Sequence, residues 1–445
     1  MADSPSQNPP KRLRQVLGMG FGLAVIIGNT IGAGILRTPG EVAAYLPNAG
    51  WFLLAWVIGG LYALLGALSI AELGTMMPQS GGQYVYAKRA LGDYAGFVVG
   101  WSDWISTCGT TALISMVIGE YASAFWPLLA GRATWIAAAV MIAFAALQWR
   151  GINWGSHIQN LTSLLKAVAF IVLVVACFAL GNRQDAPSVA PASSQPFFFS
   201  LILALQSVIY TYDGWTGVIY FSEEVQQPSR DIPRALFGGV ISIIAIYLLV
   251  NLAFLYVLPI GKMAAEPFVA GAAAQAIFGT RGEKIIQILV IISMLSSVNA
   301  NTLMASRVLF GMSRDALFSE KATTVNQGGT PTTALLVSTI IALFFVLSGT
   351  FNQVIAVLAF FFVANYTISF LSVFILRRRQ PAAPRPYRTI GYPITTGLAF
   401  FGSIAFLIGA IASDTRNSLY ALFLLAISYP AFLVIQQIGK KSRPQ

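Results

Sequence analysis

The first long apolar segment of the chain is rich in glycine. Because glycine has no side chain, the backbone of this segment is accessible for binding. The stretch IGNTIGAGIL (27–36) holds Gly28, Gly32 and Gly34 within ten residues. A lipid bilayer has no water to satisfy freed backbone groups, so non-helical backbone persists there only where it is buried in protein or lines a cavity. Many secondary transporters build the substrate site from such interrupted helices. The spacing therefore predicts a binding site made of backbone groups.

A second interruption lies in the apolar segment 197–225. Its motif YTYDGWTG, Tyr210–Gly217, places an acid and two glycines in the middle of the segment. Transporters with inverted repeats carry interrupted helices at corresponding positions of their two halves. Glycines in membrane helices also serve close helix packing, but two matched interruptions favour a site.

Ionisable side chains inside apolar segments are costly and indicate function, and candidates of this kind include Lys166, Asp103, Asp213 and Arg37. Lys166 and Asp103 lie ~20 Å and ~16 Å into their segments at the rise of an α-helix, so they are candidates to pair with each other. Asp213, at the second interruption, either recognises a substrate amine or caps the broken helix. Arg37 either pairs with Glu41, one turn away, or attracts anions.

These residues belong to a chain that reads as an all-α polytopic membrane protein. A mean hydropathy of +0.72, with 56% hydrophobic and 10% charged residues, excludes an ordinary soluble domain. Apolar runs of about twenty residues predict twelve transmembrane helices. We place them at 15–46, 51–77, 92–121, 133–150, 154–180, 197–225, 235–259, 283–312, 332–349, 352–376, 390–412 and 416–437.

The net charge of +11 fits membrane topology and gives no reason to expect nucleic-acid binding. With the N-terminus in the cytoplasm, most lysines and arginines fall on the cytoplasmic side, and the positive-inside rule then places both termini there. The chain has one histidine and neither an HExxH nor a GxSxG motif. No catalytic residue, metal site or cofactor is therefore predicted, and we do not expect an enzyme.

Five motifs resemble the amino acid–polyamine–organocation superfamily, and within it the L-type amino acid transporter-like and bacterial amino acid permease branches. They are IGNTIGAGIL with TPG, AELGTMMPQSGGQYVYAKRALG, YDGWTGVIYFSEEVQQPSRDIPRAL, SSVNANTLMASRVLFGMSRDALF and TPTTAL, in the order of the family. The resemblance implies a LeuT-like fold. Its parts are a tail at 1–14, inverted five-helix repeats at 15–180 and 197–377, two additional helices at 389–437 and a tail at 438–445.

The resemblance also implies which residues bind the substrate. In such proteins the first interrupted helix presents amides to the substrate carboxylate, and the second presents carbonyls to the amino group. Carried over by motif, these positions are Ile31, Gly32, Ala33, Gly34 and Ile35, then Tyr210, Thr211, Tyr212, Asp213 and Gly214. Trp215 and Tyr212 either wall the side-chain pocket or pack in the core. Lys166 takes the place that a sodium ion fills in sodium-coupled members.

The implied function is secondary active transport of amino acids across the plasma membrane by alternating access. The carrier is then a sodium-independent exchanger or a proton-coupled carrier. The alternative is a polyamine or organic-cation antiporter, which Asp213 favours and Arg37 opposes. The expected partners are an amino acid, the lipid bilayer and, in the proton-coupled case, protons. No accessory subunit is evident. The identity of the amino acid and the oligomeric state stay open.

Overall fold

The computed structural model describes residues 13–182, 196–348, 351–413 and 415–441. Most of the two expected tails, 1–14 and 438–445, lies outside these residues. Within the described part of the chain, helices form nearly the whole structure and no β-strand is present, apart from two isolated β-bridges. The all-helical prediction is therefore confirmed.

Seven α-helices make up the part before residue 182. They are α1 (Met19–Thr30), α2 (Gly34–Tyr45), α3 (Ala49–Met76), α4 (Gln83–Leu91), α5 (Asp93–Phe125), α6 (Ala133–Trp149) and α7 (Ile152–Leu180), with a short 3₁₀ helix η1 (Pro127–Leu129). The side chain of Asn48 caps α3 by accepting hydrogen bonds from the amides of Gly50 and Trp51 at 2.9 and 3.2 Å. Such a cap satisfies amides that a helix start leaves without partners.

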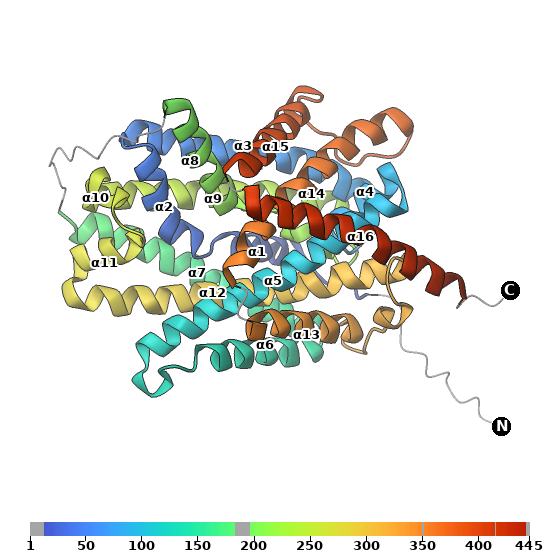
Figure 1. Cartoon of the computed structure of the whole chain (residues 1–445), viewed down its shortest axis with the longest axis horizontal. Coiled ribbons are helices and arrows are strands. Elements are labelled where there is room, and N and C mark those ends of the chain that lie inside the picture. Colours follow the sequence, from blue (N-terminus) through green and yellow to red (C-terminus); the bar gives the residue numbers. More distant parts are fainter. Residues whose placement is uncertain (1–12, 183–195, 349–350, 414, 442–445) are drawn as a thin grey trace.

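The remaining helices follow residue 196. They are α8 (Phe197–Tyr212), η2 (Gly217–Phe221), α9 (Pro228–Val257), α10 (Ile260–Ala264), α11 (Val269–Phe278), η3 (Gly279–Arg281), α12 (Gly282–Arg314), η4 (Glu320–Thr323), α13 (Thr332–Ser348), α14 (Phe351–Arg379), α15 (Ile394–Ser413) and α16 (Thr415–Lys441). Figure 1 shows α7, α9 and α12 running along the long axis of the molecule.

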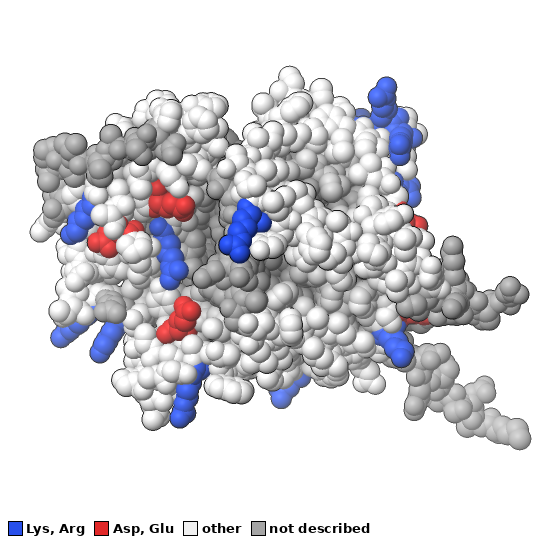
Figure 2. All heavy atoms as spheres, viewed as in Figure 1, with Lys and Arg blue, Asp and Glu red and all other residues white. Residues whose placement is uncertain are grey.

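Eight of the described helices are long and apolar enough to cross a membrane, or nine when the bent pair α1–α2 counts as one span. The chain is thus a multi-pass membrane protein, while the expected twelve spans exceed this number. Helices α6 and α13 are apolar but have only 17 residues each, and α5 carries many Ser, Thr and Gly residues that lower its hydropathy. In Figure 2, charged side chains gather mainly toward the ends of the long axis.

Several helix boundaries differ from those that hydropathy predicts. Helix α9 begins at Pro228, seven residues before the predicted start at 235. Proline suits the first turn of a helix because its missing N–H has no intrahelical acceptor there, and Asp231 in the same turn favours the positive end of the helix dipole. The short helices α4, α10 and α11 occupy segments between predicted spans.

Helix α1 lies inside the bundle. It packs against α7, α9 and α12, and α12 in turn packs along α5, α7 and α13. Because three long helices surround it, polar groups released at the end of α1 must find partners on those helices.

Candidate functional site

The first predicted interruption is present between α1 and α2. Helix α1 ends at Thr30, α2 begins at Gly34, and their axes differ by 48°. Ile31 has an extended backbone at this point, with φ −76° and ψ 100°. The first turn of a helix leaves N–H groups without intrahelical acceptors, so α2 presents amides and the positive end of its dipole at the break.

Lys166 of α7 binds the carbonyl side of this break. Its Nζ donates hydrogen bonds to the oxygens of Gly28 at 2.7 Å and Ile31 at 2.5 Å, and to Ser297 Oγ at 3.0 Å. The lysine side chain is completely buried. Ser297 and Ser293 of α12 donate to the same two carbonyls at 2.7 and 3.2 Å. The ammonium therefore contacts two carbonyl oxygens and the Ser297 hydroxyl, and the two serines bind the same carbonyls.

Asp103 and Lys166 do not form an ion pair. Instead, Asp103 Oδ1 accepts a hydrogen bond of 2.9 Å from the hydroxyl of Tyr220, which belongs to η2. The three hydrogen-bond partners of Lys166 are uncharged. The pairing considered from depth alone is thus not formed, because the two side chains lie at similar depth but contact different elements.

The second interruption separates α8 from η2 and touches the first one. Gly214 has φ +104°, a region that L-residues with a side chain rarely adopt. A Cβ placed there would lie 2.8 Å from Asn29 Nδ2 and 3.1 Å from the amide nitrogen of Thr30. Asn29 Nδ2 donates to the carbonyl of Gly214 at 3.3 Å. Glycine at 214 thus lets the two broken helices meet backbone to backbone.

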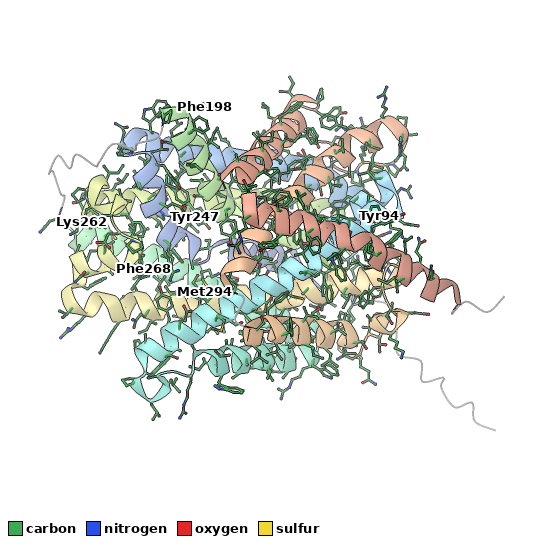
Figure 3. The ribbon with its side chains drawn as sticks, in the orientation of Figure 1. Tyr94, Phe198, Tyr247, Lys262, Phe268 and Met294 are labelled. Carbon is green, nitrogen blue, oxygen red and sulfur yellow. The ribbon has the colours of Figure 1, made fainter. Side chains whose placement is uncertain are left out.

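A second contact joins the outer parts of the breaks. A Cβ on Gly34 would lie 3.1 Å from Thr211 Cγ2, so α2 approaches α8 closely at this glycine. Tyr247 of α9 bridges the two interrupted segments. Its hydroxyl lies 2.8 Å from the carbonyl oxygen of Thr30 and 2.9 Å from that of Thr211. Figure 3 shows Tyr247 between Lys262 and Tyr94, which are labelled toward opposite ends of the molecule.

The aromatic residues of the second motif pack in the core. Tyr212 donates to the carbonyl of Trp56 at 3.1 Å, and Trp215 stacks on Tyr366 with ring centroids 5.2 Å apart. Both are 2% exposed. Asp213 accepts a hydrogen bond of 2.6 Å from Tyr366. Tyr212 and Trp215 are thus packed against other aromatic side chains, Tyr247 and Tyr366, beside the second break.

The five expected positions of the first motif lie together around the break. Ile31 and Ile35 are buried, and Gly32, Ala33 and Gly34 are partly exposed. In the second motif Thr211 is buried and Tyr210 is 36% exposed. Arg37 lies 3.5 Å from the hydroxyl of Tyr121, and no ion pair with Glu41 is formed within the described residues.

Sequence reasoning missed the polar groups of α9, α12 and α14 that hold the breaks. On α12, Ser293, Ser297 and Asn301 recur every four residues, a spacing that places them on one helix face. Asn301 donates to Asn29 Oδ1 at 2.8 Å. A polar stripe in an otherwise buried apolar helix was the available signal. Tyr247 and Tyr366 carry no comparable pattern.

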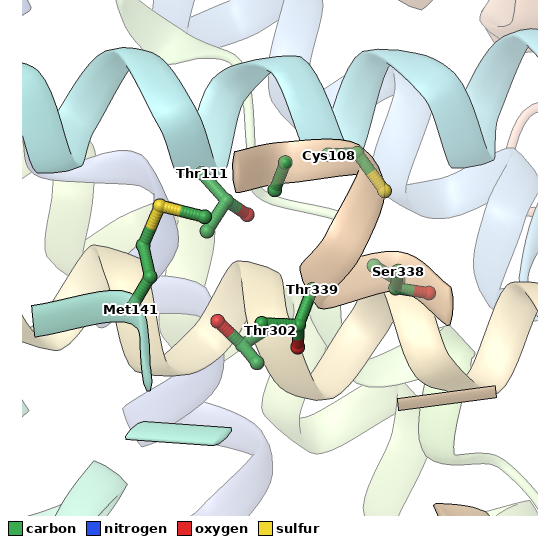
Figure 4. A pocket seen from close by; sticks show the side chains of 8 residues that line it. Cys108, Thr111, Met141, Thr302, Ser338 and Thr339 are labelled. Carbon is green, nitrogen blue, oxygen red and sulfur yellow. The ribbon is translucent and has the colours of Figure 1, made fainter. Parts of the chain in front are cut away.

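The described residues line several cavities. A cavity of about 370 Å³ is lined by Arg37, Glu41 and Glu266, and one of about 590 Å³ by Gln79, Val85 and Lys88 among others. A third cavity of about 10 Å³ lies among Cys108, Thr111, Met141, Thr302, Ser338 and Thr339 (Figure 4). That volume fits one water molecule and excludes an amino acid.

Within the described residues, no group of three or more His, Cys, Asp or Glu side chains is placed to hold a metal ion. The oxygen-lined position at the end of α1 carries the Lys166 ammonium instead.

Comparison with known proteins decides the family. The profile of the family described as amino acid permease matches residues 21–429, nearly the whole chain. The chain belongs to the amino acid permease family. It is 30% identical to a serine/threonine exchanger (SteT) of Bacillus subtilis, over 91% of this chain and 93% of that protein.

Animal relatives are more distant. A human b(0,+)-type amino acid transporter 1 is 27% identical, over 86% of this chain and 80% of its own length. A mouse large neutral amino acids transporter small subunit 2 is 24% identical, over 88% and 76%. These relatives are transporters, so the chain is grouped with membrane carriers and not with enzymes.

Proposed function

We propose that this permease moves amino acids across the plasma membrane by alternating access, independently of sodium, as an exchanger or a proton-coupled carrier. The observation that carries the proposal is the backbone contact between two broken helices, where Gly214 meets Asn29 and Thr30. Paired discontinuous helices of this kind form the substrate site of many secondary transporters. Membership of the permease family supports the same assignment.

The proposed site binds both charged ends of an amino acid through the backbone. The amides around Gly32, Ala33 and Gly34 bind the carboxylate, because the start of α2 offers N–H groups and a positive dipole end. Carbonyls of the segment 210–214 bind the ammonium group. The relatives named for serine, threonine and large neutral amino acids make neutral amino acids the first substrates to test.

We further propose the LeuT-like arrangement for the whole chain. Its repeats would be 15–180 and 197–377, each opening with a broken helix, followed by the helices of 389–437. This arrangement has twelve transmembrane helices and both termini in the cytoplasm, in agreement with the excess of Lys and Arg on that side. The proposal includes no accessory subunit.

Sodium independence rests on Lys166. Two carbonyl oxygens and the hydroxyls of Ser293 and Ser297 surround the end of α1, a set of oxygens of the kind that binds a monovalent cation at unwound helices. The ammonium of Lys166 occupies this set. A tethered cation therefore replaces a free one.

The second candidate is a polyamine or organic-cation antiporter. Asp213 favours it, because a carboxylate at the α8 break would bind an amine. In the structure, however, the Asp213 carboxylate is bound by Tyr366. The 370 Å³ cavity does not separate the two candidates, because Arg37, Glu41 and Glu266 all line it.

Uptake into proteoliposomes tests the proposal. The purified protein is given labelled amino acids and a labelled polyamine, with and without unlabelled substrate inside. We expect uptake of a neutral amino acid that internal substrate accelerates. Uptake of the polyamine alone would favour the second candidate, and uptake of neither would contradict both.

A variant at Gly32 tests the location of the site. A Cβ at this position would approach the protein no closer than 3.7 Å, at Met294 Cε. Gly32→Ala therefore fits the protein, and a loss of substrate binding reports contact with the substrate. Gly18→Ala is the matched control, because a Cβ there has nothing within 4 Å. Equal affinities in both variants would place the site elsewhere.

A further inference from the structure

The buried carboxylate of Asp103 has one oxygen without a partner. Asp103 lies on α5 and is completely buried. Its Oδ1 accepts one hydrogen bond from Tyr220, while Oδ2 is buried and has no hydrogen-bond partner. A buried carboxylate is costly unless other groups pair with it and bind its oxygens. One neutral donor does not meet that requirement.

The cations on the elements around Asp103 are bound elsewhere. Lys166 binds the carbonyls of α1, Arg307 of α12 binds Glu224, and Lys88 of α4 lies 3.0 Å from Asp315. Arg377 of α14 binds Glu72. None of the ion pairs formed among the described residues includes Asp103.

The other titratable groups nearby also leave Oδ2 without a donor. Asp213 acts on Asp103 electrostatically and has the same sign of charge. Two tyrosines of the adjoining helices donate to other carboxylates, Tyr366 to Asp213 at 2.6 Å and Tyr84 to Asp315 at 3.5 Å. Helices α6 and α13 carry no titratable residue.

Tyr220 contacts both Asp103 and the Gly81–Gly82 turn, which adjoins residues that line the 590 Å³ cavity. Its ring fills the space above Gly82, where a Cβ would lie 2.5 Å from the ring carbon Cε1. Its carbonyl accepts a hydrogen bond of 3.2 Å from the amide of Gly81. Gly81 and Gly82 lie between Gln79 and Val85, which line the cavity. Movement of η2 away from α4 would therefore open Asp103 to water.

We propose that Asp103 is a proton-binding site distinct from the amino acid site. With η2 in place, the carboxyl carries a proton and is neutral, which removes the cost of an unpaired buried charge. When η2 moves away, the O–H bond breaks, the proton passes to water and the carboxylate becomes hydrated. This inference rests on the proposed transport function, and it makes the proton the coupled ion.

Amino acid exchange at equal pH on both sides of the membrane tests the site. We expect wild-type exchange to change at least about fivefold between about pH 5 and pH 8, because one titrating group passes from ~90% to ~10% protonated over two pH units. Asp103→Asn, which cannot release a proton, should give a flat profile. Tyr220→Phe keeps the carboxyl and should move the midpoint. Asp93→Asn, an exposed carboxylate on the same helix, should keep the wild-type profile.

Two further measurements separate the possible failures. An imposed proton gradient should drive accumulation in the wild type and not in Asp103→Asn. Infrared spectra of the wild-type protein at neutral pH should show the C=O band of a protonated carboxyl. Asp103→Asn should lose this band and Asp93→Asn should keep it. This measurement does not depend on transport. A wild-type protein that moves no amino acid contradicts the proposed function. Suppose instead that the wild-type protein exchanges amino acids. The proton site alone is then contradicted if Asp103→Asn has the same pH profile as the wild type, or if the two proteins show no infrared difference.

Discussion

Replacing Lys166 with methionine separates its role at the α1 break from its role in stability. Methionine keeps a long, unbranched and flexible side chain but has no ammonium. The change removes three hydrogen bonds, to Gly28, Ile31 and Ser297. The two carbonyls do not become orphans, because Ser297 and Ser293 still donate to them. The protein should therefore still fold.

The expected loss is worked from the carbonyl of Ile31, whose remaining donor, Ser293, lies at a longer 3.2 Å. A hydrogen bond from a charged donor contributes about 1.5–3 kcal/mol. A free-energy change of about 1.4 kcal/mol corresponds to a factor of ten. The population of the binding-competent form of the break should therefore fall by about tenfold to about a hundredfold. Substrate affinity should fall by the same factor. Removing a buried charge also removes its desolvation cost, so the melting temperature should change little.

Binding of a labelled amino acid and thermal melting of the detergent-purified protein measure the two effects. Leu165→Met is the control, because Leu165 is the preceding residue of α7 and is 47% exposed. Wild-type affinity in Lys166→Met would refute the reasoning, since the ammonium would then contribute nothing to the shape of the break. A large drop in melting temperature with unchanged affinity would show a purely structural role.

Three other changes test separate parts of the molecule. Gly34→Val should abolish substrate binding, because its Cβ alone would lie 3.1 Å from Thr211 Cγ2; a variant with normal affinity would remove this stretch from the substrate site. Replacing sodium with choline at constant pH and voltage should leave uptake unchanged, and a loss would contradict the role of Lys166 as tethered cation. Arg307→Met should destabilise the protein by about 3–5 kcal/mol, because it leaves the buried carboxylate of Glu224 unpaired. Adding Glu224→Gln should restore most of this loss in thermal melts, and no recovery would contradict the pair.

The sequence was sufficient to predict the two interruptions, because glycine and acid in mid-span have few alternative explanations in an apolar segment. It also placed Lys166 correctly beside the first break. It could not predict the partner of Asp103. Depth along a helix gives position on one axis only, whereas the hydrogen bond to Tyr220 depends on which faces of α5 and η2 meet. That orientation is set by packing across the whole bundle.

The polar contacts of α9 and α12 were outside the reach of single-sequence reasoning for a related cause. Serine and asparagine in a membrane helix often bond to their own backbone or to a neighbouring helix, and the residue type does not distinguish these cases. Ser297 donates to Gly28 of α1 at 2.7 Å and lies 3.4 Å from the carbonyl of Ser293 on its own helix. Only the position of α1 against α12 makes the first contact possible.

Lys166 and Asp103 divide two tasks that a free ion performs together in ion-coupled carriers. An ion bound at an unwound helix both holds the backbone and, by leaving, carries the free energy of its gradient. Lys166 can hold the carbonyls of Gly28 and Ile31, but its covalent tether prevents it from crossing the membrane. Asp103, with one oxygen unbound, can exchange a proton with water. Lys166→Met should accordingly lower affinity at every pH, whereas Asp103→Asn should remove the dependence on pH.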